Sequence, residues 1–470
     1  MSKFNEINAQ IGRYRWTICS LVFFATTVNY LDRNVLGLLK PVLAADGVFG
    51  TDKAAQEINY SNVVICFQLA YAIGMVFAGR FIDWVGTKQG YAYSLIGWSL
   101  AAIGHAFGQH TWSFGFWRAA LGLTESGNFP AANKTMAEWF PKKERALATG
   151  LYNSGANVGA IIAPLSVPYI AEWWGWEWAF ILTGAIGLLW LFFWYRTYDS
   201  PAAKLKNGQL GQAEYDYIHS DIEEAAPAVG SEAAKVGWFK LLGFRQTWAF
   251  VLGKFLTDPI WWFYMFWLPA FLNEENARRI AAFKAINPTF AGDKSEVPGF
   301  ISWTLAVAVV YSISTVGSIF GGWLPKYFAN SGMDLNKARK LSMFLFAVGP
   351  LSVLFASRLG EINIWFAVLT IGVACAAHQA WSANIFTTVS DMFPKRAVAS
   401  VTGIGGMAGG LGGMLVAFSA GRLLAHYTTL GKIEDGYGIL FMVCGSAYII
   451  AWVVMHLLVP KFALVKLDQA

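Results

Sequence analysis

Two charged side chains stand inside an apolar segment near the start of the chain, in the stretch TVNYLDRNVL (residues 27–36). If a helix begins near Trp16, Asp32 lies about 24 Å along it, at roughly 1.5 Å per residue. Charges at such depth in an apolar medium cost several kcal/mol, so they usually face a partner or a water-filled cavity. Arg33 is suited to binding an anion, and Asp32 to pairing with a cation or carrying a proton.

Helical geometry separates these two charges. Asn29 and Tyr30 precede Arg33 by four and three residues, so all three share one face. Asp32 is rotated by about 100° from Arg33, at 3.6 residues per turn. We therefore expect Arg33, Tyr30 and Asn29 to face a ligand, and Asp32 to face another helix.

A second charged stripe occurs in the stretch FWRAALGLTESGNFP. Arg118, Gly122 and Glu125 are spaced i, i+4, i+7 and share a face, with Arg118 about 9 Å below the outer end of its helix. This depth matches that of Asp32, so we expect Asp32 to pair with Arg118 and to leave Arg33 unpaired as the anion receptor. Glu125 lies deeper, where low dielectric favours a neutral carboxyl, and it suits a group that loads and releases a proton. The alternative is a fixed structural network of Asp32, Arg118 and Glu125.

Further polar and aromatic side chains lie in other apolar segments and suit a ligand rich in hydroxyl groups. Amides hydrogen-bond hydroxyls, and aromatic faces stack on the C–H surfaces of sugars. The expected ligand contacts are Tyr71, Asn157, Trp261, His378, Gln379, Trp381 and Asn384, with Trp262 and Tyr264 as further aromatic candidates. Structural alternatives are packing for Tyr71, an interfacial belt for the aromatics and a helix–helix hydrogen bond for His378. Lys254 and Asp258, four residues apart, are interpreted as a self-satisfied ion pair.

The composition places these residues in a membrane. Hydrophobic residues make up 56% of the 470 residues and charged residues 14%, with mean hydropathy +0.43, whereas soluble domains are about a quarter charged. Apolar runs of roughly 18 or more residues recur along the chain and predict an all-α polytopic membrane protein. The net charge of +6 does not indicate nucleic acid, because the basic residues fall in short loops. The four cysteines lie in apolar segments without metal-ligand spacing, so no metal or cofactor is expected.

Twelve transmembrane helices in two six-helix bundles are predicted. The spans are 16–40, 59–82, 88–109, 112–137, 145–171, 178–196, 246–272, 300–328, 340–357, 362–389, 398–424 and 437–459. Residues 1–196 form the N-terminal bundle and 246–470 the C-terminal bundle; 197–245 is a polar linker with one amphipathic helix, and 273–299 is the longest other loop. Lys and Arg are concentrated in the termini and in the loops on the linker's side, which predicts that both termini are cytoplasmic.

An internal repeat relates the two bundles. EWFPKKERALATG (138–150) and DMFPKRAVASVTG (391–403) share acid-x-Phe-Pro-Lys and a closing Thr-Gly, at an offset of 253 residues. Parallel repeats of six helices are a known architecture of transporters, which bind their substrates between the repeats near the middle of the membrane.

Several motifs resemble one family. GRFIDWVGTK (79–88) is similar to the major facilitator signature G-x-x-x-D-x-x-G-x-K, with departures at Arg80 and Thr87. NYLDR and RAALGLTESGNFP resemble the anion:cation symporter branch, which includes vesicular glutamate, sialic acid and galactonate carriers. KFLTDPIWWFYMFWLP and HQAWSANIFTTVSDMFP resemble bacterial hexuronate transporters, which carry galacturonate and glucuronate.

The resemblance implies a proton-coupled symporter that imports a hexuronate through the bacterial inner membrane by alternating access. It implies that Arg33 and Tyr30 bind the substrate carboxylate, while Asp32 and Glu125 take part in proton coupling. An enzyme is not expected, because the sequence shows no metal-ligand cluster and no nucleophile–base pairing outside the spans. The partners expected are the sugar acid, protons and the lipid bilayer, with the chain acting as a monomer.

Other functions remain as alternatives. One is an aldonate or other organic-anion symporter, with sodium as another possible coupling ion. Galactonate-type carriers have Gln-Tyr where this chain has Ala156 and Asn157, which favours a hexuronate. A rival of another class is a sugar-acid sensor that binds its ligand without moving it.

Overall fold

The protein is helical throughout the residues described. The structure, a computed structural model, describes residues 11–220, 238–298, 300 and 302–465, and no β-strand occurs within those ranges. The main helices are α2 (Tyr14–Ala45), α3 (Lys53–Val85), α4 (Thr87–Gly104), α5 (Thr111–Glu125), α6 (Asn128–Trp139), α7 (Lys142–Trp174), α8 (Trp176–Thr197), α12 (Arg245–Ile286), α13 (Trp303–Asn330), α14 (Leu335–Val348), α15 (Ala356–Ile362), α16 (Ile364–Met392), α17 (Lys395–Thr429) and α18 (Ile433–Leu458). The all-α prediction is confirmed.

Each predicted span coincides with one helix or with consecutive helices. Span four is divided between α5 and α6, and span nine between α14, a 3-10 segment (Gly349–Phe355) and α15. Pro130 and Pro350 lie close to these breaks, and a proline cannot donate the hydrogen bond that would continue a helix. Among the described residues, eight helical segments are individually long and apolar enough to cross a membrane. A polytopic membrane protein is therefore confirmed.

Helix α12 is longer than predicted. It has 42 residues and continues to Ile286, through part of the segment 273–299 for which the sequence predicts a loop. The stretch EENARRIAAFKAI contains helix formers and neither Pro nor Gly, and an ion pair joins Glu275 to Arg278 one turn later. The helix therefore extends beyond the end of the apolar segment from which the span was predicted.

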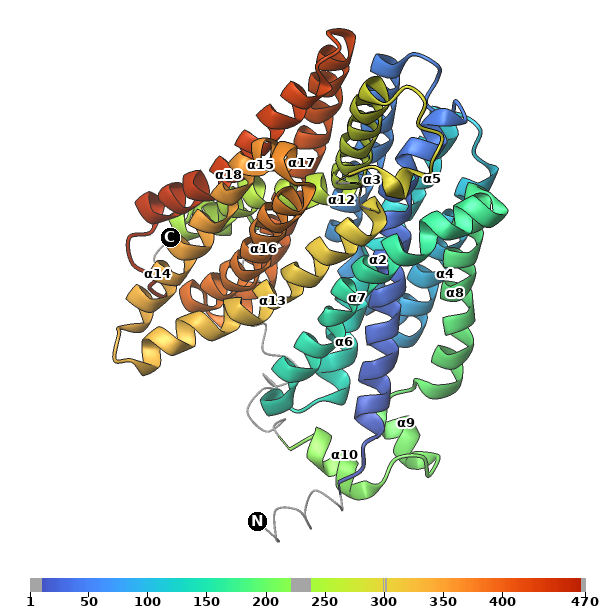
Figure 1. Cartoon of the computed structure of the whole chain (residues 1–470). Coiled ribbons are helices and arrows are strands. Elements are labelled where there is room, and N and C mark those ends of the chain that lie inside the picture. The colour runs from blue at the N-terminus through green and yellow to red at the C-terminus, as the bar shows by residue number, and fades with distance from the viewer. Residues whose placement is uncertain (1–10, 221–237, 299, 301, 466–470) are drawn as a thin grey trace.

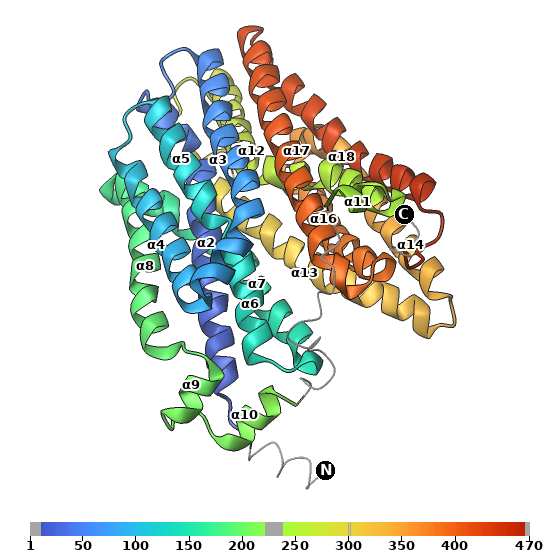
Figure 2. The same cartoon turned by 180° about the vertical axis from the view of Figure 1, so that it is seen from behind.

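The helices form two groups that meet at one end of the molecule and diverge at the other. In Figure 1 α2, α4 and α8 of the N-terminal group (α2–α8) run almost vertically, and the C-terminal group, α12–α18, leans away from them. Figure 2 shows the same arrangement from behind. The groups meet where α3 packs against α17, α7 against α13 and α2 against α12. We call the end where α2 begins the linker end and the opposite end, where α3 begins, the distal end.

Contacts between the groups are tight toward the distal end. The Tyr60 hydroxyl donates to the carbonyl oxygen of Phe266 at 2.6 Å. Gly37 packs so closely against α12 that a Cβ there would lie 2.7 Å from the carbonyl oxygen of Met265. These contacts close the distal end. The Tyr60 hydroxyl and Gly37 both depend on the position of α12, one for its hydrogen bond and the other for space.

The packing of α3 against α17 ends about two-thirds of the way along both helices, counted from the distal end. Ser61, Gln68, Ala72 and Met75 of α3 each lie against a glycine of α17. Gly79 is next in this row toward the linker end, yet a Cβ there would meet nothing within 4 Å. The two groups are therefore joined at the distal end and apart at the linker end.

The segment between the groups contains α9 (Pro201–Lys206), α10 (Gln212–Ile218) and α11 (Trp238–Leu242), where the sequence predicted one amphipathic helix. Part of this predicted linker, residues 221–237, lies outside the described residues. Helices α9 and α10 lie beneath the linker end of the N-terminal group in Figure 1.

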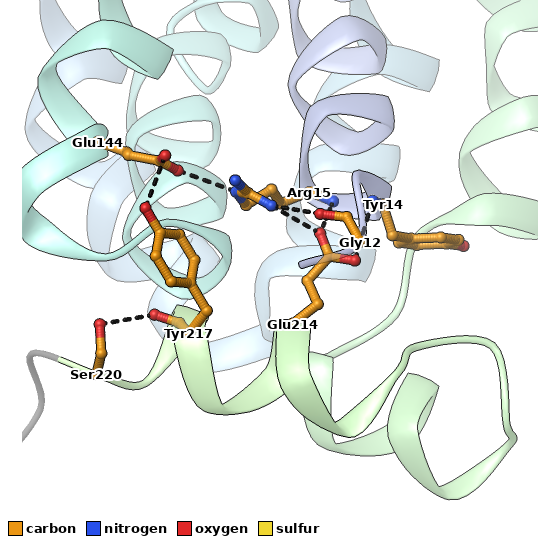
Figure 3. Close-up of polar contacts among 7 residues, drawn as sticks. All are labelled: Gly12, Tyr14, Arg15, Glu144, Glu214, Tyr217 and Ser220. Atoms are coloured by element: carbon orange, nitrogen blue, oxygen red, sulfur yellow. Dashed lines mark hydrogen bonds and ion pairs between the residues drawn. The ribbon is translucent and has the colours of Figure 1, made fainter. Parts of the chain in front are cut away.

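Glu214 of α10 binds the first turn of α2, as Figure 3 shows. The first amide groups of a helix lack partners within it. The Glu214 carboxylate accepts from the backbone N–H of Tyr14 and of Arg15, and from Arg15 Nη1, each at 3.1 Å. Arg15 Nε also donates to Glu144 of α7 at 2.9 Å, and Tyr217 of α10 donates to the same carboxylate at 2.8 Å. Helix α10 is thereby fastened to both α2 and α7.

Replacing Glu214 by alanine is expected to destabilise the protein by about 2–4 kcal/mol, because it removes a buried carboxylate and leaves Arg15 with fewer partners. The measurement is the thermal unfolding midpoint of the purified protein in detergent. Asp216→Ala is the matched control, since Asp216 is exposed on the same helix and bonds only to Gln212 among the described residues. Equal midpoints for the two variants would show that the Glu214 contacts do not stabilise the fold.

Candidate functional site

Arg33 forms a buried ion pair with Glu125, where α2 meets α5. Arg33 Nε and Nη2 bind the same oxygen, Oε2 of Glu125, at 2.8 and 2.7 Å. The side chains are 2% and 0% exposed. Arg33 Nη2 also donates to Oδ1 of Asn29 at 3.3 Å. Charge-assisted hydrogen bonds of this kind are strong, and removal of one partner from a buried pair is costly.

Four aromatic rings surround the Arg33 guanidinium and form what we call the aromatic cage. Tyr30, Phe67 and Tyr71 come from the N-terminal group, with ring centroids 4.9, 5.4 and 4.9 Å from the guanidinium carbon. Trp262 of α12 completes the cage from the C-terminal group, at 5.2 Å. Each ring face attracts the cation. Because both groups contribute, the cage is sensitive to any movement of one group against the other.

Small residues and a helix break bring Glu125 to Arg33. A side chain on Gly122 would overlap the carbonyl oxygen of Phe67, so only glycine lets α5 approach α3 this closely. Helix α5 ends at Glu125 and α6 starts at Asn128, with Pro130 in the first turn of α6. Glu125 therefore lies at a break within the fourth span, at the level of the aromatic cage.

The expected pairing of the charges is wrong. Arg33 is paired with Glu125, and no ion pair between the described residues joins Asp32 to Arg118. Arg118 Nη1 instead donates to the carbonyl oxygen of Arg33 at 3.4 Å, and neither carboxyl oxygen of Asp32 has a hydrogen-bond partner. Equal depth does not determine pairing, because the Asp32 carboxyl lies near Thr183 of α8, whereas the longer Arg33 reaches Glu125 of α5.

Two predicted ligand residues meet each other across the interface. Gln379 Nε2 of α16 donates to Oδ1 of Asn157 on α7 at 3.2 Å. Both side chains are partly exposed, so they are accessible where the two groups face each other. The structure thus brings Asn157 and Gln379 together, as it does Asn29, Tyr30, Arg33, Tyr71 and Glu125.

The remaining predicted ligand residues make contacts within the C-terminal group. His378 stacks on Trp261 with ring centroids 5.1 Å apart, and its Nδ1 lies 2.5 Å from the Tyr448 hydroxyl. This contact joins α16 to α18 and is the helix–helix hydrogen bond that is the structural alternative to ligand binding for His378. Trp381 donates to the Thr257 hydroxyl at 3.1 Å.

Asn384 donates to the carbonyl oxygens of Gly321 and Ala380, at 2.7 and 2.9 Å. It therefore ties α16 to α13 and is not turned toward Arg33. Of the neighbouring tryptophans of α12, it is Trp262 that covers Arg33, while Trp261 packs against His378 and Tyr311.

Gln68 is a site residue that the sequence prediction missed. It is fully buried on α3, and neither its amide nitrogen nor its oxygen has a hydrogen-bond partner in the described structure. Its carboxamide lies beside Gly413 of α17, which also borders Trp262. Its position three residues before Tyr71 puts both on one face of α3, which is the signal that could have identified it.

Unbonded polar atoms gather around Arg33. Besides Gln68, they include Asn29 Nδ2 and Glu125 Oε1. Buried polar groups are nearly always hydrogen-bonded in native proteins, so a cluster of unbonded donors and acceptors indicates a place where a polar ligand binds. Among the described residues, no group of three or more His, Cys, Asp or Glu is placed to hold a metal ion. Chemically, the site offers one guanidinium, flat aromatic faces and free amides.

Comparisons with known proteins agree with this fold. The family model of the Major Facilitator Superfamily matches residues 22–417. The chain is 31% identical over 422 residues to the hexuronate transporter of Escherichia coli (strain K12), covering 88% of each chain. It is 30% identical over 432 residues to the D-galactonate transporter of Escherichia coli O6:H1, covering 89% of this chain and 91% of that one.

The crystal structure of a D-xylose–proton symporter has the same fold, with a TM-score of 0.68 at 14% identity, covering 96% of this chain and 99% of that one. The family match spans most of the chain, and the two curated relatives are aligned over nearly all of it. The resemblance found in the sequence motifs is thereby confirmed, and the chain is a membrane transporter that belongs to the major facilitator superfamily.

Proposed function

We propose that the protein is a proton-coupled symporter that imports a hexuronate, such as galacturonate or glucuronate, through the bacterial inner membrane. The observation that carries the proposal is the Arg33–Glu125 ion pair inside an aromatic cage to which both helix groups contribute. The relative named as a hexuronate transporter supports the substrate class.

The substrate carboxylate and Glu125 compete for one guanidinium. While Glu125 is ionised it holds Arg33 at 2.7 Å, and a second carboxylate at the same place would meet its negative charge. Protonation of Glu125 removes that charge and releases the Arg33 fork for a bidentate bond to the substrate. Binding of the proton and binding of the acid therefore favour each other, which is the thermodynamic basis of symport.

The body of the sugar lies between the two helix groups. Tyr30, Tyr71 and Trp262 present ring faces to its C–H surfaces. Donors and acceptors for its hydroxyl groups come from Asn29 and Gln68, and from Asn157 and Gln379, which bond to each other across the interface in this structure. His378, Trp261, Trp381 and Asn384 support this surface from within the C-terminal group.

Asp32 and Arg118 extend the proton path. The Asp32 carboxyl is 2% exposed, and the groups that act on it include the Thr183 hydroxyl of α8 and the Arg118 guanidinium, which does not form an ion pair with it. An ionised carboxylate is costly in such a place unless a cation approaches it. Asp32 is thus a second group that exchanges a proton when Arg118 moves.

The chain works as a monomer of two bundles, residues 1–196 and 246–470, with both termini and the linker in the cytoplasm. With that orientation, the distal end is periplasmic and the structure is inward-facing, because the groups are joined at the distal end and diverge at the linker end. Alternating access then requires the contacts between Tyr60 and Phe266 to break.

A second candidate is an aldonate symporter, favoured by the 30% identity to the D-galactonate transporter. Both candidates use the same carboxylate receptor, and they differ in whether the other end of the substrate is a ring or an open chain. Asn157, which replaces the tyrosine of galactonate-type carriers, favours the hexuronate.

The proposal is tested by uptake into proteoliposomes with an imposed pH gradient, inside alkaline. Labelled galacturonate is expected to accumulate against its gradient, and to be displaced by glucuronate more strongly than by galactonate or phosphate. If galacturonate accumulates only when a sodium gradient is imposed, sodium and not the proton is the coupling ion. Uptake of galactonate in preference to both hexuronates would establish the second candidate.

A further inference from the structure

Three side chains on α12 form a stripe that leads from the aromatic cage toward the linker end. Lys254, Asp258 and Trp262 are spaced at intervals of four residues, so they lie on one face of the helix. Trp262 is part of the aromatic cage around Arg33. Since α12 starts at the linker end, Asp258 lies about one helical turn, roughly 6 Å, from Trp262 toward that end. Asp258 is therefore the charged side chain of α12 that lies next to the aromatic cage on this face, on the side of the linker end.

Lys254 and Asp258 form an ion pair that leaves the carboxylate accessible. Lys254 Nζ lies 2.5 Å from Oδ2 of Asp258, and the lysine side chain is 6% exposed while the aspartate is 20% exposed. The ammonium also lies 4.2 Å from the ring centroid of Phe386, inside the C-terminal group. The lysine is thus the buried support of the pair, and Asp258 is the member that a ligand can reach.

Other helices place Asp258 next to the cage. The carboxylate packs against Gly409 of α17, where a Cβ would overlap it. It also interacts electrostatically with the phenols of Tyr30 and Tyr71, two rings of the aromatic cage. A sugar acid whose carboxylate is bound by Arg33 has its far end about one helical turn away, which is the distance that Asp258 occupies along α12.

We propose that Asp258, held by Lys254, is the specificity-determining residue that binds the hydroxyl end of a monocarboxylate sugar acid and rejects a second carboxylate there. This inference rests on the proposed function and refines it, since it excludes hexarates, in which both ends are carboxylates. A carboxylate accepts hydrogen bonds from hydroxyl groups but repels another carboxylate, and specificity often depends on such a repulsive element. Lys254 does not attract the second carboxylate, because Asp258 already neutralises it.

The test compares inhibition by galacturonate, by galactonate and by galactarate. Galactonate and galactarate are both open chains, and galactarate differs from galactonate in carrying a second carboxylate in place of the terminal hydroxymethyl group. Counterflow of labelled galacturonate in proteoliposomes is measured for wild type, Asp258→Asn and Lys254→Met/Asp258→Asn. Asp199→Asn is the matched control, because Asp199 also pairs with a lysine, Lys88 at 3.1 Å, but lies beyond the end of α8. Wild type and control are expected to bind galactarate about 100-fold more weakly than galacturonate.

In Asp258→Asn the released Lys254 is expected to strengthen galactarate binding by about tenfold or more. In the double variant the repulsion is also removed but no free lysine attracts the second carboxylate, so galactarate binding improves by less than in Asp258→Asn. Galacturonate binding falls by about tenfold because its hydroxyl end loses a charged acceptor, so the ratio of the two affinities narrows. The double variant buries no unpaired charge, so it tests the proposal even if the single variant does not fold. An unchanged ratio in the double variant, or wild type that binds both acids equally, overturns the role of Asp258. Wild type that transports neither acid would instead refute the proposed function.

Discussion

Replacement of Arg33 by alanine is expected to abolish saturable binding and uptake of the sugar acid, with a loss of affinity of at least about 100-fold. The guanidinium is the cation that all four rings of the aromatic cage surround, and it makes charge-assisted bonds worth about 1.5–3 kcal/mol each. Its removal also leaves the buried Glu125 carboxylate without its partner. Binding is measured by the ligand-induced rise in the thermal unfolding midpoint, and uptake in proteoliposomes.

Arg33→Lys separates charge from geometry. Lysine keeps the positive charge but cannot form a planar bidentate bond or stack in the cage as a guanidinium does. We expect it to recover only a small part of the affinity. Arg196→Ala, at the exposed end of α8, is the control for loss of an arginine and should bind normally. If Arg33→Ala retains wild-type affinity, the carboxylate docks elsewhere and the receptor role assigned to Arg33 is wrong.

The sequence predicts this site well where the prediction depends on a single helix. The shared face of Asn29, Tyr30 and Arg33 follows from helical spacing, and the structure shows Arg33 in contact with both neighbours. The stripe of Arg118, Gly122 and Glu125 also holds, because all three meet α2 or α3. Apolar length likewise locates the spans, since it reflects the thickness of the membrane.

The predictions fail where they depend on how two helices are rotated against each other. Asp32 and Arg118 lie at similar depth, as the sequence predicts, and they are close enough to interact electrostatically. Depth alone, however, does not determine which arginine forms an ion pair with which carboxylate. In the same way, neighbouring Trp261 and Trp262 cannot be distinguished by composition. Only the packing of α12 against α3 and α17 shows that Trp262 covers Arg33. These are properties of tertiary packing, and local spacing does not contain them.

Glu125→Gln is expected to uncouple transport from the proton gradient. Glutamine has the shape of a protonated glutamate, so it no longer competes with the substrate for Arg33 and cannot take up or release a proton. Concentrative uptake should fall until the internal and external concentrations are about equal, a ratio of about 1. Exchange of labelled for unlabelled substrate should persist, because the exchange cycle requires no change in protonation. Both activities are measured in the same proteoliposomes.

The control for this variant is Glu57→Gln, which also removes the carboxylate of a largely buried ion pair in the N-terminal group, with Lys40 at 2.7 Å near the distal end. It should still concentrate the substrate, since Lys40 and Glu57 do not touch the aromatic cage. A Glu125→Gln protein that concentrates substrate like wild type would place proton coupling elsewhere, with Asp32 as the next carboxyl to test. Loss of exchange as well as accumulation would mean that Glu125 is required for binding itself. The accumulation and exchange assays together therefore distinguish a coupling role for Glu125 from a purely structural role. The Arg33–Glu125 distance alone is compatible with both roles.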